Sequence, residues 1–279
     1  MVRIGLLTSG GDCQALNATM RGIVKTVVNL STEPVEIYGF EDGYQGMIYK
    51  RYRKMAPVDF SGILTRGGTI LGTSRTPFKR LDTPEADGVD KVAAMKETYR
   101  ELKLDCLFML GGNGSTKTAN RLREEGLSVI ALPKTIDNDT WGTDLTFGFT
   151  SAVEIATKCI DDIHTTASSH GRVFVIEIMG HKVGWIPLYA AVAGGADVCL
   201  IPEIPYDMDN VIAAINRRMQ AGARFTIIVV AEGAISRDEA TLSKKEYKKL
   251  VAARTSPSIV YDIAREIEAR TGRETCVAI

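Results

Sequence analysis

Short apolar runs alternate with amphipathic stretches along most of the chain. The runs, bounded by glycine, proline or acidic residues, cover 3–8, 35–40, 106–110, 128–132, 172–178, 198–202 and 225–231. Runs that are apolar throughout are typical of strands buried on both faces of a parallel sheet. Apolar residues at helical spacing predict helices over 17–29, 87–102, 117–125, 151–167, 209–221 and 256–270, with loops at 41–48 and 140–149. The pattern therefore predicts an α/β protein.

The alternation of strands and helices falls into two blocks that meet near residues 140–150. Glycine turns follow strands in both blocks, which is typical of doubly wound sheets. We therefore expect two doubly wound, mainly parallel-sheet domains, at 1–142 and 143–279, facing each other across an active-site cleft.

The clearest candidate site lies at 105–139, where a strand, a glycine turn, a helix and a strand lead into the sequence PKTIDND at 133–139. In a parallel sheet both turns lie at the carboxyl ends of neighbouring strands, where open α/β sheets bind ligands. Glycines let the backbone approach a ligand, and the following helix N-terminus favours anions. The turn GGNGS at 111–115 alone is often only a turn, but two aspartates, an asparagine and a lysine within PKTIDND are more specific. Together the two motifs indicate phosphoryl transfer.

Charge and cysteine content narrow the class of protein. The 279 residues include 34 acidic and 34 basic ones, so the formal net charge is zero, which argues against a nucleic-acid or membrane-surface partner. Five cysteines occur without a CxxC or Cys/His cluster, which argues against structural zinc and favours a reducing compartment. No long apolar span is present. We expect a cytoplasmic protein.

The sequence resembles the 6-phosphofructokinases over essentially its whole length. The shared motifs, in the family's order and spacing, are SGGDCQALN at 9–17, GGTILGTSR at 67–75, GGNGS, PKTIDND, MGH at 179–181 and VAEG at 230–233. The resemblance implies ATP-dependent phosphorylation of fructose 6-phosphate at its 1-hydroxyl, giving fructose 1,6-bisphosphate in glycolysis, with Mg²⁺ as cofactor. It also implies a homo-oligomer, either a dimer or a tetramer.

The resemblance assigns site residues in the first domain. Nucleotide contacts are expected from Gly11, Arg75, Thr76, Gly112, Asn113, Gly114 and Ser115. Asp137 is expected to be the catalytic base, with Thr135 orienting the acceptor, and Asp139 and Asn113 are expected to bind magnesium. Gly11 and Arg75 would assist the transferred phosphoryl group, and Lys134 would contact the substrate.

Further substrate contacts are expected in the second domain, from Arg172, Met179, Gly180, His181 and Glu232. Arg172 would hold the 6-phosphate from across a subunit interface. Glu232 would accept hydrogen bonds from the sugar hydroxyls, a role that suits a carboxylate. The alternative for Glu232 is a strand-end charge that faces water.

Three residues depart from the family pattern and keep alternatives open. Asn113 replaces an aspartate, and His181 and Cys276 replace arginines. They leave open a catalytically weak nucleotide- or sugar-phosphate-binding regulatory homologue. For the donor, Gly114 favours ATP because a side chain there would occupy the volume of the α-phosphate, whereas Lys134 also occurs in pyrophosphate users. We expect ATP, with pyrophosphate as the alternative donor.

The last residues, 271–279, are predicted to be a glycine turn and the start of another strand. A strand cut short exposes unpaired backbone groups, which proteins normally avoid. We therefore expect the source reading frame to continue past Ile279, into a segment that completes the sugar-phosphate site.

Overall fold

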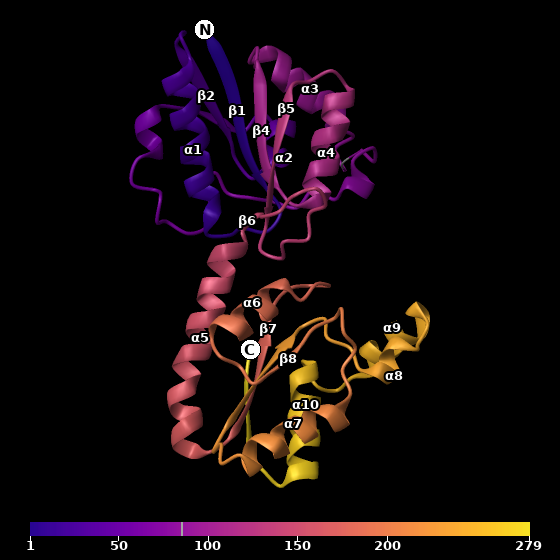
Figure 1. Cartoon of the computed structure of the whole chain (residues 1–279). Helices are drawn as coiled ribbons and strands as arrows, with labels where there is room; N and C mark the ends of the chain where they lie inside the picture. The colour runs from indigo at the N-terminus through magenta and orange to yellow at the C-terminus, as the bar shows by residue number, and fades with distance from the viewer. Residues whose placement is uncertain (85) are drawn as a thin grey trace. The chain divides into compact units, whose positions relative to one another are not determined.

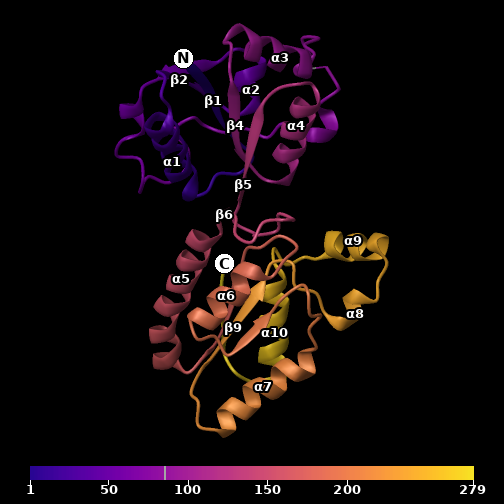
Figure 2. The same cartoon turned by 45° about the horizontal axis from the view of Figure 1, so that its top comes forward.

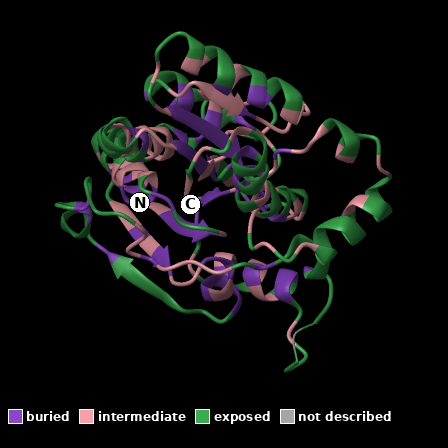
Figure 3. Ribbon diagram, turned by 90° about the horizontal axis from the view of Figure 1, so that it is seen from below, coloured by how far each residue is buried: buried purple, intermediate pink, exposed green. Residues whose placement is uncertain are grey.

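The computed structural model describes residues 1–84 and 86–279. The chain divides into two compact units, Met1–Phe149 (unit 1) and Thr150–Ile279 (unit 2), each with its own sheet (Figure 1). Figure 3 shows that the buried residues gather on the strands, while the outer surfaces of the helices are exposed. None of the helices in the described ranges has the length and apolar character needed to span a membrane.

The sheet of unit 1 has six strands in the order β3-β2-β1-β4-β5-β6. Their bounds are β1 Val2–Ser9, β2 Val35–Phe40, β3 Tyr52–Met55, β4 Cys106–Gly111, β5 Val129–Thr135 and β6 Phe147–Gly148. Only the pairing of β2 with β3 is antiparallel among the described strands. The chain leaves β1 toward β2 and later returns to β4 on the other side of β1. The carboxyl ends of β1 and β4 therefore flank the point where strand order reverses, which is where such sheets bind ligands.

Helices cover both faces of this sheet (Figures 1 and 2). One face packs against α2 (Tyr44–Ile48), α3 (Lys91–Glu101) and α4 (Asn113–Glu124) through a buried cluster that includes Leu7, Leu107 and Met109. The other face packs against α1 (Ala15–Leu30) through Ile4, Leu6 and Leu110. Neighbouring residues of β1 and β4 thus point to opposite cores, as expected for strands buried on both sides. Two short 3₁₀ helices, Pro57–Phe60 and Phe78–Arg80, lie in the connection between β3 and α3.

Unit 2 has a parallel sheet of four strands in the order β10-β7-β9-β8. The strands are β7 Val173–Ile178, β8 Val198–Leu200, β9 Thr226–Ala231 and β10 Thr275–Ala278. The helices are α5 Phe149–His170, α6 Trp185–Ala193, α7 Met208–Gln220, α8 Arg237–Ala240, α9 Lys244–Ala253 and α10 Ile259–Thr271. Helices α7 and α10 pack on one face through a single apolar cluster, and α5 and α6 lie on the other (Figures 1 and 2).

The predicted fold class of parallel-sheet α/β units is confirmed, and the strands and helices predicted from periodicity all form, with shifted ends. The prediction missed several elements, among them short ones and a uniformly apolar one. Helix α2 replaces part of the predicted loop 41–48, and β6 forms near the end of the predicted loop 140–149. Helix α6 was missed because its sequence, WIPLYAAVA, has no polar face to show a helical period.

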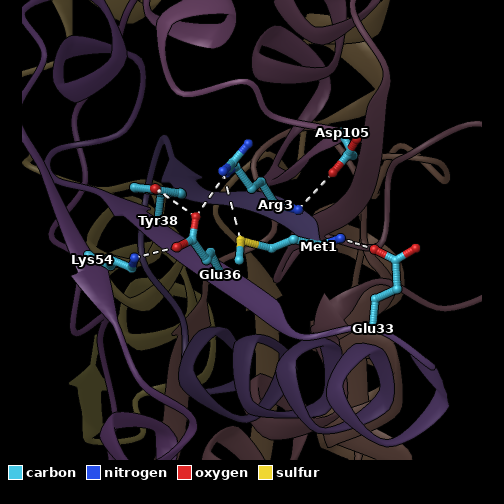
Figure 4. A network of polar contacts seen from close by, with 7 residues as sticks. All are labelled: Met1, Arg3, Glu33, Glu36, Tyr38, Lys54 and Asp105. Atoms are coloured by element: carbon cyan, nitrogen blue, oxygen red, sulfur yellow. Dashed lines mark hydrogen bonds and ion pairs between the residues drawn. The ribbon is translucent and has the colours of Figure 1, made fainter.

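At the amino-terminal edge of the unit 1 sheet, one carboxylate joins three strands (Figure 4). Glu36 on β2 accepts a hydrogen bond from Arg3 Nε on β1 at 2.8 Å, and it pairs with Lys54 on β3. The Tyr38 hydroxyl donates to the same carboxylate at 3.2 Å. The hydrogen bonds from Lys54 and then Arg3 hold the pKa of Glu36 at about 2, below its ordinary value of 4.5.

This lowered pKa predicts an acid-dependent contribution of Glu36 to stability. A depressed pKa stabilises the folded state above pH 4.5, and the contribution disappears as the pH falls from 4.5 to about 2. We expect Glu36→Gln to lower the free energy of unfolding at pH 7 and to match the unmodified protein near pH 2. Urea unfolding across this range measures the difference. Glu124→Gln on the exposed surface of α4 is the control, and a pH-independent difference for Glu36→Gln would contradict the assignment.

Candidate active site

Two glycine turns meet where strand order reverses in unit 1. The first, Gly10-Gly11-Asp12, follows β1, and the second leads from β4 into α4, whose first residues are Asn113, Gly114 and Ser115. Gly112 precedes the helix, and no side chain in the described ranges caps it. The first N–H groups of a helix lack intrahelical partners and carry partial positive charge. An anion is therefore favoured beside this turn.

Hydrogen bonds link these two turns to each other. Ser115 Oγ on α4 donates to Ser9 Oγ at the end of β1, at 2.8 Å. The buried Tyr44 hydroxyl donates to the Ser115 carbonyl, also at 2.8 Å. The N-terminus of α4 is thus held at a defined position relative to the β1 turn, which sets where a phosphate could lie against both.

The segment 67–76 is bonded to the same β1 turn. Gly10 N donates to Ser74 O at 3.0 Å, and Thr73 Oγ1 donates to Gly10 O at 2.7 Å. Arg75 follows directly, and its side chain is exposed. Thr76 is buried, and its hydroxyl has no hydrogen-bond partner among the described residues. The structure therefore brings Arg75 and Thr76 beside the glycine turn, although they lie more than 60 residues from it in sequence.

Lys134 joins β5 to the β1 turn. It is 5% exposed, and its Nζ donates to the carbonyl of Gly11. A Cβ placed on Gly10 would lie 3.7 Å from Nζ. Burial is the main cause of the lowered pKa of Lys134. The hydrogen bond to Gly11 holds Nζ at a defined position within the donor turns.

The glycines of the turns serve different purposes. A Cβ on Gly111 would lie 2.5 Å from Ser115 Cβ, so this glycine is needed for packing. A Cβ on Gly112 would lie 3.4 Å from Lys134 O. On Gly11 or Gly114, a Cβ would meet no atom within 4 Å. These two positions leave open space above the turns, where a ligand could approach the backbone.

PKTIDND is partly strand rather than wholly loop, because β5 continues to Thr135. Thr135 Oγ1 lies 3.4 Å from Asp137 Oδ2, to which it donates, and it accepts from Asp137 N at 3.2 Å. Asn138 has φ of 55° and is bonded within its own loop. Its Oδ1 accepts from Thr146 N at 2.9 Å, and its Nδ2 donates to Asp144 O at 3.2 Å. Asn138 therefore shapes the loop, leaving Asp139 exposed.

No group of three or more His, Cys, Asp or Glu side chains that could hold a metal occurs within 1–84 and 86–279. Asn113 and Asp139 are both exposed at this edge of the sheet. One carboxylate with one amide oxygen fits magnesium, which retains waters and binds phosphate oxygens.

In unit 2, Glu232 is bonded to the turn that carries the predicted sugar-binding residues. It follows β9, and its Oε1 accepts from Gly180 N at 3.1 Å and from His181 N. His181 has φ of 53°, and Met179 is exposed. The Glu232 carboxylate thus anchors the turn at 179–181, although the residue is also exposed to water as the alternative expected.

Arg172 lies at the opposite end of β7 from that turn, since it precedes Val173 and the turn follows Ile178. A strand of six residues spans roughly 20 Å. Arg172 and the residues at 179–181 therefore cannot contact the same small sugar phosphate within one unit.

Glu177 on β7 was not predicted as a site residue. It is half-buried, and its Oε2 has no hydrogen-bond partner in the described ranges. Burial, followed by the nearby charge of Glu232, raises the pKa of Glu177. The sequence signal was available, because Glu177 is the only charged residue in the strand VFVIEI.

The comparison with known families agrees with these features. The sequence model of the family described as phosphofructokinase matches residues 3–279. The chain belongs to the phosphofructokinase family. ATP-dependent 6-phosphofructokinase of Spirochaeta thermophila is 54% identical over 279 residues, covering 99% of this chain and 75% of that protein. ATP-dependent 6-phosphofructokinase 3 of Bacteroides thetaiotaomicron is 46% identical over 275 residues, covering 98% and 76%.

Solved phosphofructokinase structures share the fold. The phosphofructokinase of Saccharomyces cerevisiae superposes with a TM-score of 0.81 at 30% identity, covering 100% of this chain and 38% of that chain. A pyrophosphate-dependent phosphofructokinase from Nitrosospira multiformis gives 0.81 at 20% identity, covering 99% and 68%. The second likeness concerns the fold alone. The predicted resemblance to the phosphofructokinase family is confirmed.

The contacts of Asn138 predict how the loop that carries Asp137 and Asp139 is stabilised. Asn138→Ala removes two hydrogen bonds, each worth about 1 kcal/mol, and places alanine in a left-handed conformation that costs about 1–2 kcal/mol. Asn138→Gly loses the same bonds without the backbone cost. We expect the free energy of unfolding to fall in both variants, by about 1 kcal/mol more in the alanine one. Urea unfolding measures it, and equal losses would show that the left-handed backbone is not strained.

Proposed function

We propose that this chain is an ATP-dependent 6-phosphofructokinase, which phosphorylates fructose 6-phosphate at its 1-hydroxyl to give fructose 1,6-bisphosphate. The observation that carries the proposal is the meeting of two glycine turns, a fixed ammonium and the Thr135–Asp137 pair at one sheet edge of unit 1. The names of the relatives at 54% and 46% identity support the same reaction.

ATP is the donor that the glycine turns favour. The open space above Gly114 and Gly11 can admit a triphosphate, and the N-terminus of α4 attracts its negative charge. Gly112, Asn113 and Ser115 are the other contacts proposed from this turn. Arg75 can bind phosphate oxygens in a bidentate manner, Thr76 lies beside it, and Lys134 neutralises charge at the β1 turn.

Asp137 is proposed as the base. The 1-hydroxyl oxygen of the sugar attacks the γ-phosphorus, its proton passes to the Asp137 carboxylate, and ADP leaves with the bridging oxygen. A base must lie within hydrogen-bond reach of the proton it accepts. The contact with Thr135 Oγ1 orients Asp137. Phosphoryl transfer depends mainly on positioning and charge stabilisation, and Lys134 and Arg75 are proposed to supply the stabilising charge.

Asp139 and Asn113 are proposed to hold Mg²⁺ together with oxygens of the nucleotide. When bound, magnesium neutralises the phosphate charge that develops during transfer. Asn113 contributes a neutral oxygen where most of the family supplies a carboxylate. We expect this site to hold magnesium with less charge from the protein.

The sugar phosphate is assigned to residues 143–279 and the nucleotide to residues 1–142. Met179, Gly180, His181 and Glu232 are proposed to bind the sugar. The distance along β7 supports a second copy as the source of the 6-phosphate ligand Arg172, which makes the active protein a homo-oligomer. A catalytically weak binding homologue is the second candidate, and the departures at Asn113, His181 and Cys276 favour it.

Substitution of the proposed base separates these two candidates. We expect Asp137→Asn to lower kcat by about 10²–10⁴-fold, the usual contribution of a positioned general base. The affinity for fructose 6-phosphate should change far less, because asparagine keeps the shape of the side chain. Steady-state kinetics with ATP and Mg²⁺, alongside equilibrium binding, measure both quantities. A variant that retains near-full kcat would exclude Asp137 as the base, and an inactive unmodified protein that still binds ligand would favour the regulatory homologue.

The donor is tested at Gly114. We expect the unmodified protein to turn over with ATP and not with pyrophosphate. Gly114→Asp should raise the KM for ATP by more than tenfold, since a carboxylate would both fill the open space and repel phosphate. Gly114→Ala is the matched control for side-chain size without charge. Faster turnover of the unmodified protein with pyrophosphate than with ATP would reject the assignment.

A further inference from the structure

Arg172 is already engaged by neighbouring groups of unit 2. Its Nη2 pairs with Glu274 Oε1 at 2.6 Å, and its Nη1 lies 3.9 Å from Cys276 Sγ. Strand β10 pairs in parallel with β7, with Thr275 opposite Val173. This register places Glu274 and Cys276 beside the side chain that precedes β7.

The remaining part of the guanidinium is closed to a ligand from solvent. Nε of Arg172 is buried and has no hydrogen-bond partner among the described residues. An anion can therefore reach Arg172 only through Nη1 and Nη2, the groups that already contact Glu274 and Cys276. The Glu274 side chain is 62% exposed, against 29% for Arg172, so Glu274 can move into water while Arg172 stays in place.

We infer that Glu274 is an internal competitor for the phosphate that Arg172 binds, and that it lowers the affinity of this site for phosphate. The inference rests on the proposed function, in which Arg172 binds the 6-phosphate. A carboxylate and a phosphate seek the same pair of guanidinium donors. A phosphate carries more charge and an additional acceptor oxygen, so it can displace Glu274.

The expected size of this competition is modest. Exposed ion pairs contribute about 0.2–1 kcal/mol, which corresponds to a change in affinity of about 1.5- to 5-fold. Cys276 lies at the same edge and provides no positive charge to offset Glu274. Each phosphate that binds must therefore break the Arg172–Glu274 pair without help from a second cation at position 276.

Glu274→Gln tests the competition, because it keeps the size of the side chain and removes its charge. We expect the Kd of fructose 6-phosphate and of inorganic phosphate, measured by calorimetry on the full chain, to fall about 2- to 5-fold. In steady-state assays with ATP, the KM for fructose 6-phosphate should fall by more than kcat changes. Glu266→Gln is the matched control, since it removes the same charge from α10, where Glu266 pairs with Arg270 at 3.0 Å.

The inference also predicts that the effect of Glu274→Gln on binding requires Arg172. Arg172→Ala and the double variant Arg172→Ala/Glu274→Gln should bind fructose 6-phosphate equally, because Glu274 then has nothing to occupy. Arg172→Met, which keeps the length of the side chain and removes its charge, replaces alanine in both if the alanine variant fails to fold. Weaker binding by Glu274→Gln would overturn the inference and make Glu274 a residue that positions Arg172. An equal gain in Glu266→Gln would overturn it as a general charge effect.

The proposed reaction is judged separately, by turnover of ATP and fructose 6-phosphate in the unmodified chain. If Arg172→Ala leaves the Kd of fructose 6-phosphate unchanged, Arg172 does not bind the substrate, and the competition by Glu274 is overturned with it. Turnover by the unmodified protein would still support the proposed reaction in that case.

Discussion

The buried ammonium of Lys134 is the interaction on which the candidate site most depends. Removing a charge from water is costly unless hydrogen bonds and opposite charges offset it. The carbonyl of Gly11 supplies the hydrogen bond, and Asp12 and Asp137 supply negative charge nearby. Because Lys134 lies next to the last residue of β5 and Gly11 follows β1, this one contact joins the strand that leads into the acidic loop to the glycine turn across β4. An anionic ligand at the turns would offset the buried charge further.

In unit 2 a carboxylate holds a turn at the end of a strand, whereas in unit 1 an ammonium does so. Glu232 accepts hydrogen bonds from two consecutive backbone N–H groups, which fixes the turn at 179–181. Burial, followed by the charge of this nearby carboxylate, raises the pKa of half-buried Glu177. This turn lacks regular secondary structure and is thus stabilised by the charged side chain that directly follows β9. Such charge-assisted bonds are stronger than neutral ones, and a turn held in this way presents its side chains at a constant position.

The parts of the molecule that were predictable from sequence depend on local patterns. The buried strands β1, β4, β7 and β9 were visible because a strand covered on both faces is apolar at most positions. Helix α9 was missed although its Ser243 and Glu246 form a capping box that the sequence displays. Helix α6 is apolar on all sides and α2 has only five residues, so neither shows a helical period in its sequence. For these two helices, packing against the sheet decides the structure.

The sequence by itself determined the α/β class, the motifs at the strand ends and the resemblance to phosphofructokinases, because these depend on short stretches of consecutive residues. Only the tertiary structure decided which polar groups meet. Lys134 and Gly11 are separated by more than 120 residues. They meet because β1 pairs with β4 and β4 pairs with β5. The Arg172–Glu274 pair likewise exists only because β10 returns to lie beside β7. No local pattern records such pairings, since strand order and register place these side chains together.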